Sequence, residues 1–480
     1  MAVIAEAGEP VAAQSWPAQE EWRARSLDER AAVLRRVVRV LIDRADEIAA
    51  TVIEETGKPA VEALVHDVFP AVDHAWWLAR NAPRVLRHER LRIPQLDVKH
   101  KRAWLRYEPL GVVGVISPFN IPFAIPFTEV ATAVVAGNGV VLKPSEHTPR
   151  SGDWVERVLV EAGAPRGLVR VVHGAGDAGE AVARDPDIAK LFFTGGSRGG
   201  RAVAVAAAER LCPVVLELGG KDPMLVFADA DLDRAVEGGL WAAFLNGGQA
   251  CVSADRIYVE RPRYEAFVER FAARARELRR GADVAPPITP AQGARMQDLV
   301  ADAVERGARV VADEPATVLV DLPPEARVAR EEVFGPIVSV APFEDEDDAV
   351  RLANDSPFGL GASVWTRDSA RARRVADRIE AGMVWVNDYG YSFGTGQASW
   401  GGVKSSGFGR TKSKHGLYEC VSVKYVDADR GRFRPPWWFP YDEEQLAGLR
   451  ASLEVLYGDR LRGAWRGRRE LLRLGKRIRA

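Results

Sequence analysis

The sequence predicts an α/β protein built from two parallel-sheet lobes. Its 480 residues exceed the roughly 250 to 300 that one hydrophobic core usually serves, so we expect two large lobes. From residue 111 onward, short β-rich apolar runs alternate with helical segments and Gly or Pro turns, which is typical of βαβ units. The sequence has no repeat of about 20 to 50 residues and no low-complexity linker, so the lobes should pack together.

The individual segments support this prediction in order. Residues 27–86 place apolar side chains such as Leu34 and Leu41 at helical spacing and predict a helical entry region. Four apolar runs predict strands of a first parallel sheet that is covered on both faces, namely residues 111–116, 140–142, 169–172 and 191–193. A second α/β stretch covers residues 213–410 and begins with the apolar run 213–218, which we assign to the second lobe.

The last part of the chain has a different composition. After residue 428 come several arginines, the aromatic run WWFPY (residues 437–441) and a helical pattern rich in Arg and Leu. This tail is basic, although Lys plus Arg (66) and Asp plus Glu (67) nearly cancel over the whole chain. An Arg-rich amphipathic helix could lie on an anionic membrane surface. Packing against a partner subunit or against the protein itself is the alternative that we favour.

Composition and charge exclude several classes of protein. The apolar fraction of 47% and the charged fraction of 28% are those of a soluble globular protein, and the balanced charge gives no general attraction to nucleic acid. We see no secretory signal and no window of about 18 uncharged apolar residues, so we expect a cytoplasmic location. Three cysteines are too few for a disulfide framework and too far apart for a CxxC metal site, so we predict no metal.

Cys251 is the strongest candidate for a reactive group. It ends the run NGGQAC (residues 246–251), in which two glycines let the backbone pass close to a neighbour and small residues leave the sulfur accessible. Such a thiol suits nucleophilic attack on a carbonyl carbon. A buried and inert cysteine is the alternative, and the local pattern leaves both open.

Glu217 ends an apolar run and precedes two glycines in the sequence ELGGK (residues 217–221). Desolvation at the end of a buried strand disfavours the charged carboxylate and raises its pKa into the range of a general base. The alternative is a strand-end glutamate that pairs with a nearby Lys or Arg, and this residue alone does not decide between the two.

Three further segments follow predicted strands, where open α/β sheets bind ligands. The turn FTGGSRGG (residues 193–200) lets backbone amides and a helix N-terminus approach a phosphate. The Arg-Ala pair after it stands where a P-loop needs Lys and Ser or Thr, so dinucleotide binding is left open. Asn120 could donate a hydrogen bond to an oxyanion or be a plain turn residue. Lys143 and Glu146 supply a cation and a carboxylate after the next strand.

Together and in this order, the motifs make the chain resemble the aldehyde dehydrogenase superfamily over residues 27–426. Seven segments carry the resemblance: SPFN (117–120), LKPSE (142–146), FTGGS (193–197), ELGGK (217–221), GQAC (248–251), EEVFGP (331–336) and GGVKSSG (401–407). Each segment is weak alone, whereas seven in one order are very specific. The resemblance implies a Rossmann-like cofactor lobe, a catalytic lobe that contains the thiol, and a β-arm by which subunits pair.

The resemblance divides the chain into four expected parts. These are the NAD(P)-binding domain (1–86 and 110–217), the catalytic domain (218–412), the oligomerisation β-arm (87–109 and 413–428) and the basic C-terminal tail (429–480). We therefore expect a homodimer or homotetramer that binds a small-molecule aldehyde, with no nucleic-acid partner.

Carried over position by position, the resemblance also implies the site. Cys251 is similar to the nucleophile, and Glu217 to the general base that activates the hydrolytic water. Asn120 is similar to the side-chain half of the oxyanion hole, whose other half is the Cys251 backbone amide. Lys143 and Glu146 match positions that contact the adenosine ribose. The further positions expected to bind NAD, or NADP, are Ile116, Ser117, Phe119, Gly195, Gly196, Gly200, Leu218, Glu332 and Phe334.

The implied reaction oxidises an aldehyde to a carboxylic acid. The Cys251 thiolate attacks the aldehyde, amide donors hold the oxyanion, hydride leaves to the nicotinamide, and water hydrolyses the thioester with help from Glu217. The presence of Glu217 argues against the coenzyme-A-acylating branch of the family.

Gly196 replaces a serine that is usual in the pyrophosphate turn, so one contact to the cofactor is lost. A non-catalytic binding protein on the same fold is a further alternative, against which the intact set of Asn120, Glu217 and Cys251 argues.

The sequence favours an apolar or aromatic aldehyde as the substrate. Succinate-semialdehyde members of the family often carry an arginine in the helix after the Asn120-like position, and residues 123–132 contain none. The expected substrate loop, YGYSF (residues 389–393), is aromatic instead. A dehydrogenase of the succinate-semialdehyde type is the alternative.

Overall fold

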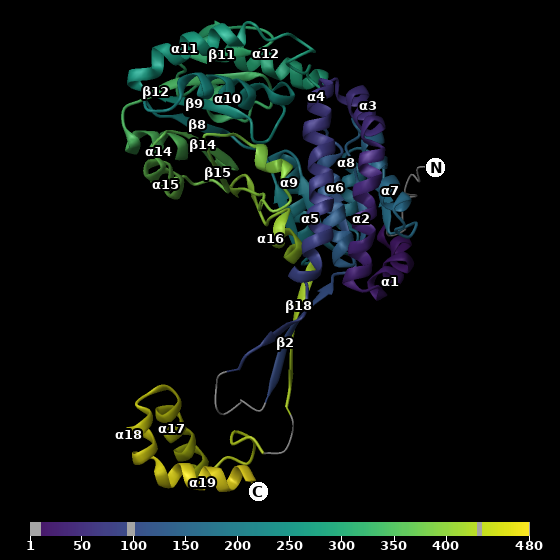
Figure 1. Ribbon diagram of the computed structural model, residues 1–480, viewed down its shortest axis with the longest axis vertical. Coiled ribbons are helices and arrows are strands. Elements are labelled where there is room, and N and C mark those ends of the chain that lie inside the picture. The colour runs from purple at the N-terminus through teal and green to yellow at the C-terminus, as the bar shows by residue number, and fades with distance from the viewer. Residues whose placement is uncertain (1–10, 94–100, 430–433, 480) are drawn as a thin grey trace. The chain divides into compact units, whose positions relative to one another are not determined.

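The chain folds into two compact units in the computed structural model (Figure 1). The described residues are 11–93, 101–429 and 434–479. The larger unit is Met1–Leu86 with Pro109–Val421, and the smaller unit is Arg87–Glu108 with Ser422–Ala480. Outside the described residues lie 1–10 of the predicted cofactor domain, 94–100 of the predicted arm, and 430–433 and 480 of the predicted tail. Within the described ranges, no helix combines the length and the apolar character that crossing a membrane requires.

Helices form the N-terminal part of the larger unit, as the apolar spacing predicts. These elements are η1 (Val11–Ser15), α1 (Trp16–Ala24), α2 (Leu27–Asp43), α3 (Ala45–Thr56), α4 (Ala60–Glu62), η2 (Ala63–Val68) and α5 (Phe69–Val85). A capping box between Ser26 and Glu29 starts α2. Helices α2 and α5 lie side by side (Figure 1). Element η2 is a π-helical turn, a feature that is frequent at functional sites.

The first sheet has six strands in the order β17-β7-β6-β3-β4-β5. They are β3 (Val112–Ile116), β4 (Gly139–Lys143), β5 (Val169–Val171), β6 (Ile188–Thr194), β7 (Val214–Glu217) and β17 (Gly407–Phe408). The intervening helices are α6 (Ala124–Ala136), α7 (Pro149–Glu161), α8 (Gly176–Arg184) and α9 (Ser197–Ala208). The four runs predicted as strands therefore lie in one sheet, and their pairings are parallel, as predicted. Helix α6 is buried along its whole length because α2 and α5 cover it.

The second sheet has seven strands in the order β10-β11-β12-β9-β8-β14-β15, all parallel except the β10–β11 pair. The strands are β8 (Asp222–Val226), β9 (Ala254–Glu260), β10 (Arg309–Ala312), β11 (Thr317–Val320), β12 (Ile337–Phe343), β14 (Gly361–Trp365) and β15 (Met383–Val386). The helices are α10 (Leu232–Phe244), α11 (Arg261–Ala275), α12 (Pro290–Glu305), α13 (Arg327–Arg330), α14 (Glu346–Asn354) and α15 (Ser369–Arg378). Helix α16 (Ser413–Glu419), in a segment predicted as part of the β-arm, instead packs against α5 and α6. A two-stranded sheet joins β13 (Phe358–Gly359) to β16 (Val403–Lys404).

The strand that ends at Glu217 belongs to the first sheet, so our assignment of the run 213–218 to the second lobe was wrong. Strand β7 pairs in parallel with β6, and Glu217 is in register with Thr194. An apolar run carries no signal of which sheet it joins. Strand β17 pairs with the other edge of β7 and places Gly407 opposite Glu217. At Gly407 φ is +114° and a Cβ would lie 1.9 Å from the Leu216 carbonyl oxygen, so this pairing requires glycine.

The smaller unit contains a three-stranded sheet and three helices. The strands, in the order β1-β2-β18, are β1 (Glu89–Leu91), β2 (Arg102–Pro109) and β18 (Val421–Ala428). The helices, yellow in Figure 1, are α17 (Glu443–Tyr457), α18 (Arg460–Arg466) and α19 (Arg468–Arg479). Ion pairs join Lys424 to Glu108 and Lys101 to Asp427 across the sheet. Strand β18 forms one edge of this sheet.

Candidate active site

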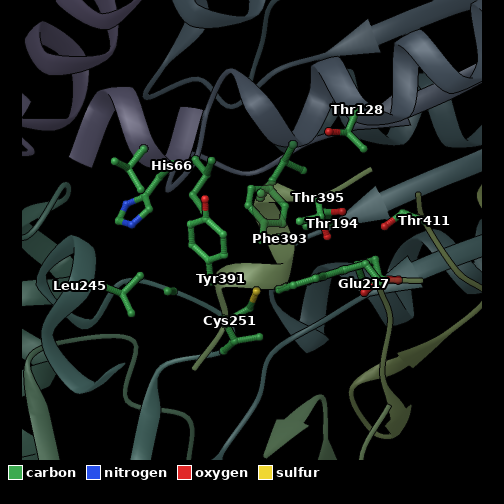
Figure 2. Close-up of a pocket in the computed structure, with 18 of the residues that line it drawn as sticks. His66, Thr128, Thr194, Glu217, Leu245, Cys251, Tyr391, Phe393, Thr395 and Thr411 are labelled. Atoms are coloured by element: carbon green, nitrogen blue, oxygen red, sulfur yellow. The ribbon is translucent and has the colours of Figure 1, made fainter. Parts of the chain in front are cut away.

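A cavity of about 300 Å³ lies between the two sheets of the larger unit and holds the predicted thiol (Figure 2). Its lining comes from η2 and α5, from α6, from the ends of β6 and β7, from the Cys251 loop, and from residues 390–395 and 411. Cys251, Glu217 and Leu218 all contribute to it, so the cavity brings together three of the predicted site residues from both lobes.

Cys251 follows the short 3-10 turn η3 (Leu245–Gly248), and its sulfur points into the cavity (Figure 2). The turn has left-handed backbone at Asn246, Gly247 and Gly248, and a Cβ on Gly247 would lie 2.3 Å from the Ala285 carbonyl oxygen. A Cβ on Gly248 would lie 2.1 Å from the Gly335 carbonyl oxygen, so the glycine allows the loop to approach the segment after Glu332. The two glycines predicted to permit a close approach therefore do so, and Cys251 is partly accessible.

The thiol lies among carboxyl groups. Burial raises the pKa of the Cys251 thiol above its ordinary value, and the nearby carboxyls of Asp222, Glu217 and Glu332 raise it further. Burial in turn raises the pKa values of Asp222 and Glu217 well above their usual range and that of Glu332 to about 7. At neutral pH the thiol is therefore protonated, and a nearby positive charge or base is needed to form the thiolate.

Glu217 has no counter-ion bond at the end of β7. Its side chain is buried, and neither carboxylate oxygen has a hydrogen-bond partner among the described residues. Burial raises the pKa of Glu217, the neighbouring Glu129 raises it further, and Arg410 lowers it. This contradicts the alternative of a strand-end glutamate in an ion pair. A desolvated and unpaired carboxyl in a cavity is instead a candidate acid or base.

Glu129 and Thr194 are cavity residues that the sequence did not single out. Glu129 lies on α6, and one of its carboxyl oxygens accepts a hydrogen bond of 2.9 Å from the Thr194 hydroxyl. The other oxygen has no hydrogen-bond partner in the described part of the chain. Burial raises the pKa of Glu129 to about 8, so its carboxyl is mostly neutral at neutral pH. The motif ends at residue 120, and no local pattern marks a glutamate nine positions later.

Both the side-chain amide and the backbone carbonyl of Asn120 form hydrogen bonds with the Cys251 loop. Its side-chain amide donates a hydrogen bond of 3.0 Å to the Gln249 carbonyl oxygen, two residues before Cys251. Its backbone carbonyl accepts hydrogen bonds from the Lys58 ammonium at 2.8 Å and from the Asn246 amide at 3.0 Å. Asn120 does not line the 300 Å³ cavity, but its NH₂ group has a second N–H and lies next to the thiol loop.

Sequence motifs did not reveal a buried ion pair that contacts Asn120. Lys58 Nζ lies 3.0 Å from Asp67 Oδ2, and both side chains are fully buried. The other oxygen of Asp67 accepts backbone hydrogen bonds from Phe123 and Ala124, at the start of α6. Asp67 lies in the π-helical turn η2. Only the folded chain brings this pair to residues some sixty positions away, so sequence spacing could not predict it.

A second cavity of about 660 Å³ lies at the carboxyl ends of β3, β4 and β6. Of the predicted cofactor residues it contains Ile116, Ser117, Lys143 and Glu146. Lys143 Nζ lies 3.2 Å from a Glu146 oxygen, so the predicted cation and carboxylate meet. Residues that the sequence did not single out also line it, chiefly Gly176, Gly179, Glu180, Arg184 and Arg201 from α8 and α9. This is the place where a parallel α/β sheet binds a ligand.

The glycine turn before α9 has two kinds of glycine. Gly196 is the residue before the twelve-residue helix α9, makes no side-chain cap, and would have open space around a Cβ. Gly195 and Gly200 instead lie against Phe193 and Leu218. An uncapped helix N-terminus beside a large cavity fits a pyrophosphate, so the residues present fit a nicotinamide dinucleotide.

Glu332, Phe334 and Phe119 lie near the junction of the lobes and do not line the 660 Å³ cavity. The Glu332 carboxylate lies against the backbone of Gly219, next to the strand end of Glu217. The rings of Phe119 and Phe334 meet edge to face with centroids 5.9 Å apart, which brings the two lobes into contact.

The described lining of the thiol cavity includes aromatic side chains and no Lys or Arg. Figure 2 shows Tyr391 and Phe393, from the predicted substrate loop and element η4 (Tyr391–Gly394), on the side of the cavity that faces Cys251. Tyr389 of the same loop is buried and does not line it. The described lining residues include acidic side chains but no Lys or Arg, and burial lowers the pKa of His66 to about 3, so it is neutral. The described residues contain no cluster of three or more His, Cys, Asp or Glu side chains able to hold a metal.

Comparison with known proteins gives one consistent result. The model of the aldehyde dehydrogenase family matches residues 5–426. The chain is 37% identical over 452 residues to 4,4'-diapolycopene aldehyde oxidase from Methylomonas sp, which covers 91% of this chain and 85% of that protein. Among solved structures, it resembles an E. coli NADP-dependent enzyme (36% identity, TM-score 0.83, covering 87% of this chain and 89% of the other). It also resembles succinate-semialdehyde dehydrogenase from Burkholderia pseudomallei (35% identity, TM-score 0.82, covering 86% and 88%).

Proposed function

The chain belongs to the aldehyde dehydrogenase family, and we propose that it oxidises an apolar aldehyde through a thioester on Cys251. The resemblance inferred from the seven motifs is thereby confirmed, as is the prediction of an NAD(P)-dependent oxidoreductase. The observation that carries the site assignment is that Cys251 and the unpaired Glu217 share one cavity that has no fixed cation.

Cys251 is the proposed nucleophile and Asn120 the proposed oxyanion donor. Attack by the thiolate on the aldehyde carbon forms a C–S bond and an oxyanion, which needs donors in place before the reaction. The Asn120 amide donates one N–H to the Gln249 carbonyl, its other N–H has no acceptor among the described residues, and the Cys251 backbone N–H is the other proposed donor. The Lys58 and Asn246 hydrogen bonds to the Asn120 carbonyl hold that amide in place.

The cofactor site is proposed to run from Glu146 to Glu332. Lys143 and Glu146 would hold the adenosine ribose, Gly196 at the start of α9 the pyrophosphate, and Glu332 the nicotinamide ribose. When bound, NAD(P)⁺ supplies a positively charged ring and accepts the hydride. On this basis the cofactor domain comprises residues 1–86 and 110–217, and the catalytic domain residues 218–412.

Glu217 is the proposed base for thioester hydrolysis. The raised pKa of its carboxyl makes it a stronger base than an exposed glutamate once it loses its proton. Neither of its oxygens accepts a hydrogen bond from a described residue, so a water molecule in the cavity would be their partner. A chain with this base in place fits hydrolytic release of the acid better than transfer of the acyl group to coenzyme A.

The cavity supports an apolar aldehyde more than an acidic one. Tyr391, Phe393, Trp241 and Ile125 contribute apolar surface, and the described lining offers no Lys or Arg to hold a substrate carboxylate. The similar protein from Methylomonas is named for a 4,4'-diapolycopene aldehyde. The similar structure named for succinate semialdehyde defines the competing substrate class.

The test compares kcat/KM for a series of straight-chain aldehydes, an aromatic aldehyde and succinate semialdehyde, followed by absorbance of the reduced cofactor. We expect kcat/KM to rise with chain length and to be lowest for succinate semialdehyde. A preference for succinate semialdehyde over an apolar aldehyde of equal chain length would contradict the substrate assignment. If none of the aldehydes is oxidised, the catalytic assignment would be contradicted.

We further infer a homodimer or homotetramer. Strand β18 forms an edge of its sheet, and its Val423 and Tyr425 side chains are exposed. An exposed edge strand with apolar side chains is a surface that can pair with another chain. Light scattering of the purified protein measures the mass directly, and a monomer would contradict this inference.

A further inference from the structure

Exposed apolar side chains are concentrated in the smaller unit. Ten large ones lie between residues 437 and 472, namely Trp437, Trp438, Phe439, Tyr441, Leu446, Leu453, Tyr457, Leu461, Trp465 and Leu472. Soluble proteins seldom leave so many large apolar groups together on the surface unless another surface covers them. The question is which kind of surface that is.

Helix geometry places these side chains in stripes. Leu446, Leu453 and Tyr457 are seven and four residues apart in α17, so they lie along one face of the helix. Leu461 and Trp465 are four residues apart in α18 and are 84% and 81% exposed. Each of the two helices therefore carries apolar side chains on one face that are more than half exposed, with Arg450 among those of α17.

The aromatic segment before α17 is held in a defined conformation. The Gln445 side chain is buried and donates hydrogen bonds to the carbonyl oxygens of Pro436 and Trp438, at 2.5 and 3.2 Å. The rings of Phe439 and Tyr441 lie with centroids 4.5 Å apart, and both are exposed. Aromatic groups are thus presented on a fixed scaffold.

The end of the same unit is strongly basic. From residue 458 to the end, the sequence contains nine Arg and Lys residues and two acidic ones, whereas residues 434–457 contain two arginines and four acidic residues. Five exposed arginines of the tail form no hydrogen bond or ion pair through their side chains with any described residue: Arg450, Arg460, Arg466, Arg468 and Arg469. These charges are free to meet an anionic surface.

We propose that the segment 434–476 docks on the surface of a membrane that contains anionic lipids. Exposed Trp, Tyr and Leu beside unpaired Arg is the combination that interfacial segments use, with apolar groups entering the headgroup boundary and arginines meeting lipid phosphates. A second copy of the same surface would place like charges against each other. Packing within the smaller unit leaves these side chains exposed.

The proposal goes beyond the proposed reaction, and its test does not depend on turnover. Full-length protein is sedimented with vesicles of phosphatidylcholine alone, and with vesicles of equal parts phosphatidylcholine and phosphatidylglycerol. We expect binding to the second kind only, and weaker binding at high salt. Replacing both Arg466 and Arg469 by Gln should lower the partition coefficient by on the order of tenfold or more, since each basic residue contributes several-fold.

Matched variants separate the apolar and the charge contributions. Leu461→Ser with Trp465→Ser should also reduce binding at least about tenfold, whereas Leu211→Ser, at an exposed leucine of the larger unit, should not. Arg35→Gln with Arg373→Gln is the charge control, since both arginines are exposed on the larger unit. Absence of binding to anionic vesicles would overturn the proposal. So would tail variants that change the oligomer mass by light scattering and leave vesicle binding unchanged, because the surface would then belong to a partner subunit.

Discussion

Glu129 and Glu217 are linked through Thr194: the Thr194 hydroxyl donates a 2.9 Å hydrogen bond to Glu129, and Thr194 is the residue in register with Glu217 across β6 and β7. Two buried carboxyls therefore share one cavity with Cys251. Ionisation of either disfavours ionisation of the other, because like charges repel strongly where water is excluded.

The first prediction is that Glu129→Gln shifts the pH dependence of turnover to lower pH. The Glu129 carboxyl raises the pKa of Glu217, so removing its charge lowers that pKa and ionises the base earlier as the pH rises. The measurement is the rising limb of kcat against pH. Glu156→Gln, at a half-buried glutamate outside the cavity, is the matched control. A shift toward higher pH would mean that Glu129 helps Glu217 to ionise.

The second prediction separates Cys251 from Glu217. Cys251→Ala should abolish oxidation, because no thioester can form. Glu217→Gln should allow acylation and hydride transfer but slow hydrolysis by about 100-fold to 10,000-fold, giving one burst of reduced cofactor per active site. Stopped-flow absorbance and intact mass after aldehyde addition measure the burst and the adduct. Steady turnover of the Gln variant at the parent rate would rule out Glu217 as the base.

The third prediction concerns the choice between NAD and NADP. A carboxylate at Glu146 beside the ribose hydroxyls repels a 2′-phosphate, so kcat/KM should be higher with NAD. Glu146→Ser should reduce that preference. Arg201 lines the same cavity, and Arg201→Gln should lower kcat/KM with NADP more than kcat/KM with NAD. A higher kcat/KM with NADP for the parent protein would contradict this assignment of Glu146.

The fourth prediction concerns the buried pair Lys58 and Asp67. Lys58→Met leaves the Asp67 carboxylate without its cation and should lower the free energy of unfolding by about 3 to 5 kcal/mol. Lys58→Met with Asp67→Asn should be less destabilised than Lys58→Met alone, because the uncompensated charge is gone. Urea unfolding of the single and double variants gives both values. Equal stability of Lys58→Met and the parent would show that the pair contributes nothing.

The functional residues that lie in short motifs could be predicted from the sequence. The residues that contact them could not. Cys251 and Glu217 could be found because the glycines next to them leave a local pattern. Glu129 and Lys58 have ordinary neighbours, and their significance arises from contacts with Thr194 and Asn120 far along the chain. Local sequence carries no information about such contacts, because the tertiary fold creates them.

The alternation of apolar runs and helices predicted the parallel sheets correctly, but it placed β7 in the wrong lobe. Sheet membership depends on which strand edges are free once the chain has folded, and an apolar run is equally suited to either sheet. The predicted set of cofactor residues came from the family resemblance, and spacing alone would not have found it.

Pairing of β17 with β7 has a consequence for the order in which the protein is made. Strand β7 emerges from the ribosome with one edge unpaired, and the strand that covers this edge is synthesised only after nearly the whole second lobe. A fragment that ends at residue 217 would keep a bare strand edge next to a desolvated glutamate, and such edges promote aggregation. We therefore expect residues 1–217 expressed alone to be insoluble, as judged by soluble yield. The first lobe cannot complete its sheet independently, although it comes first in the chain.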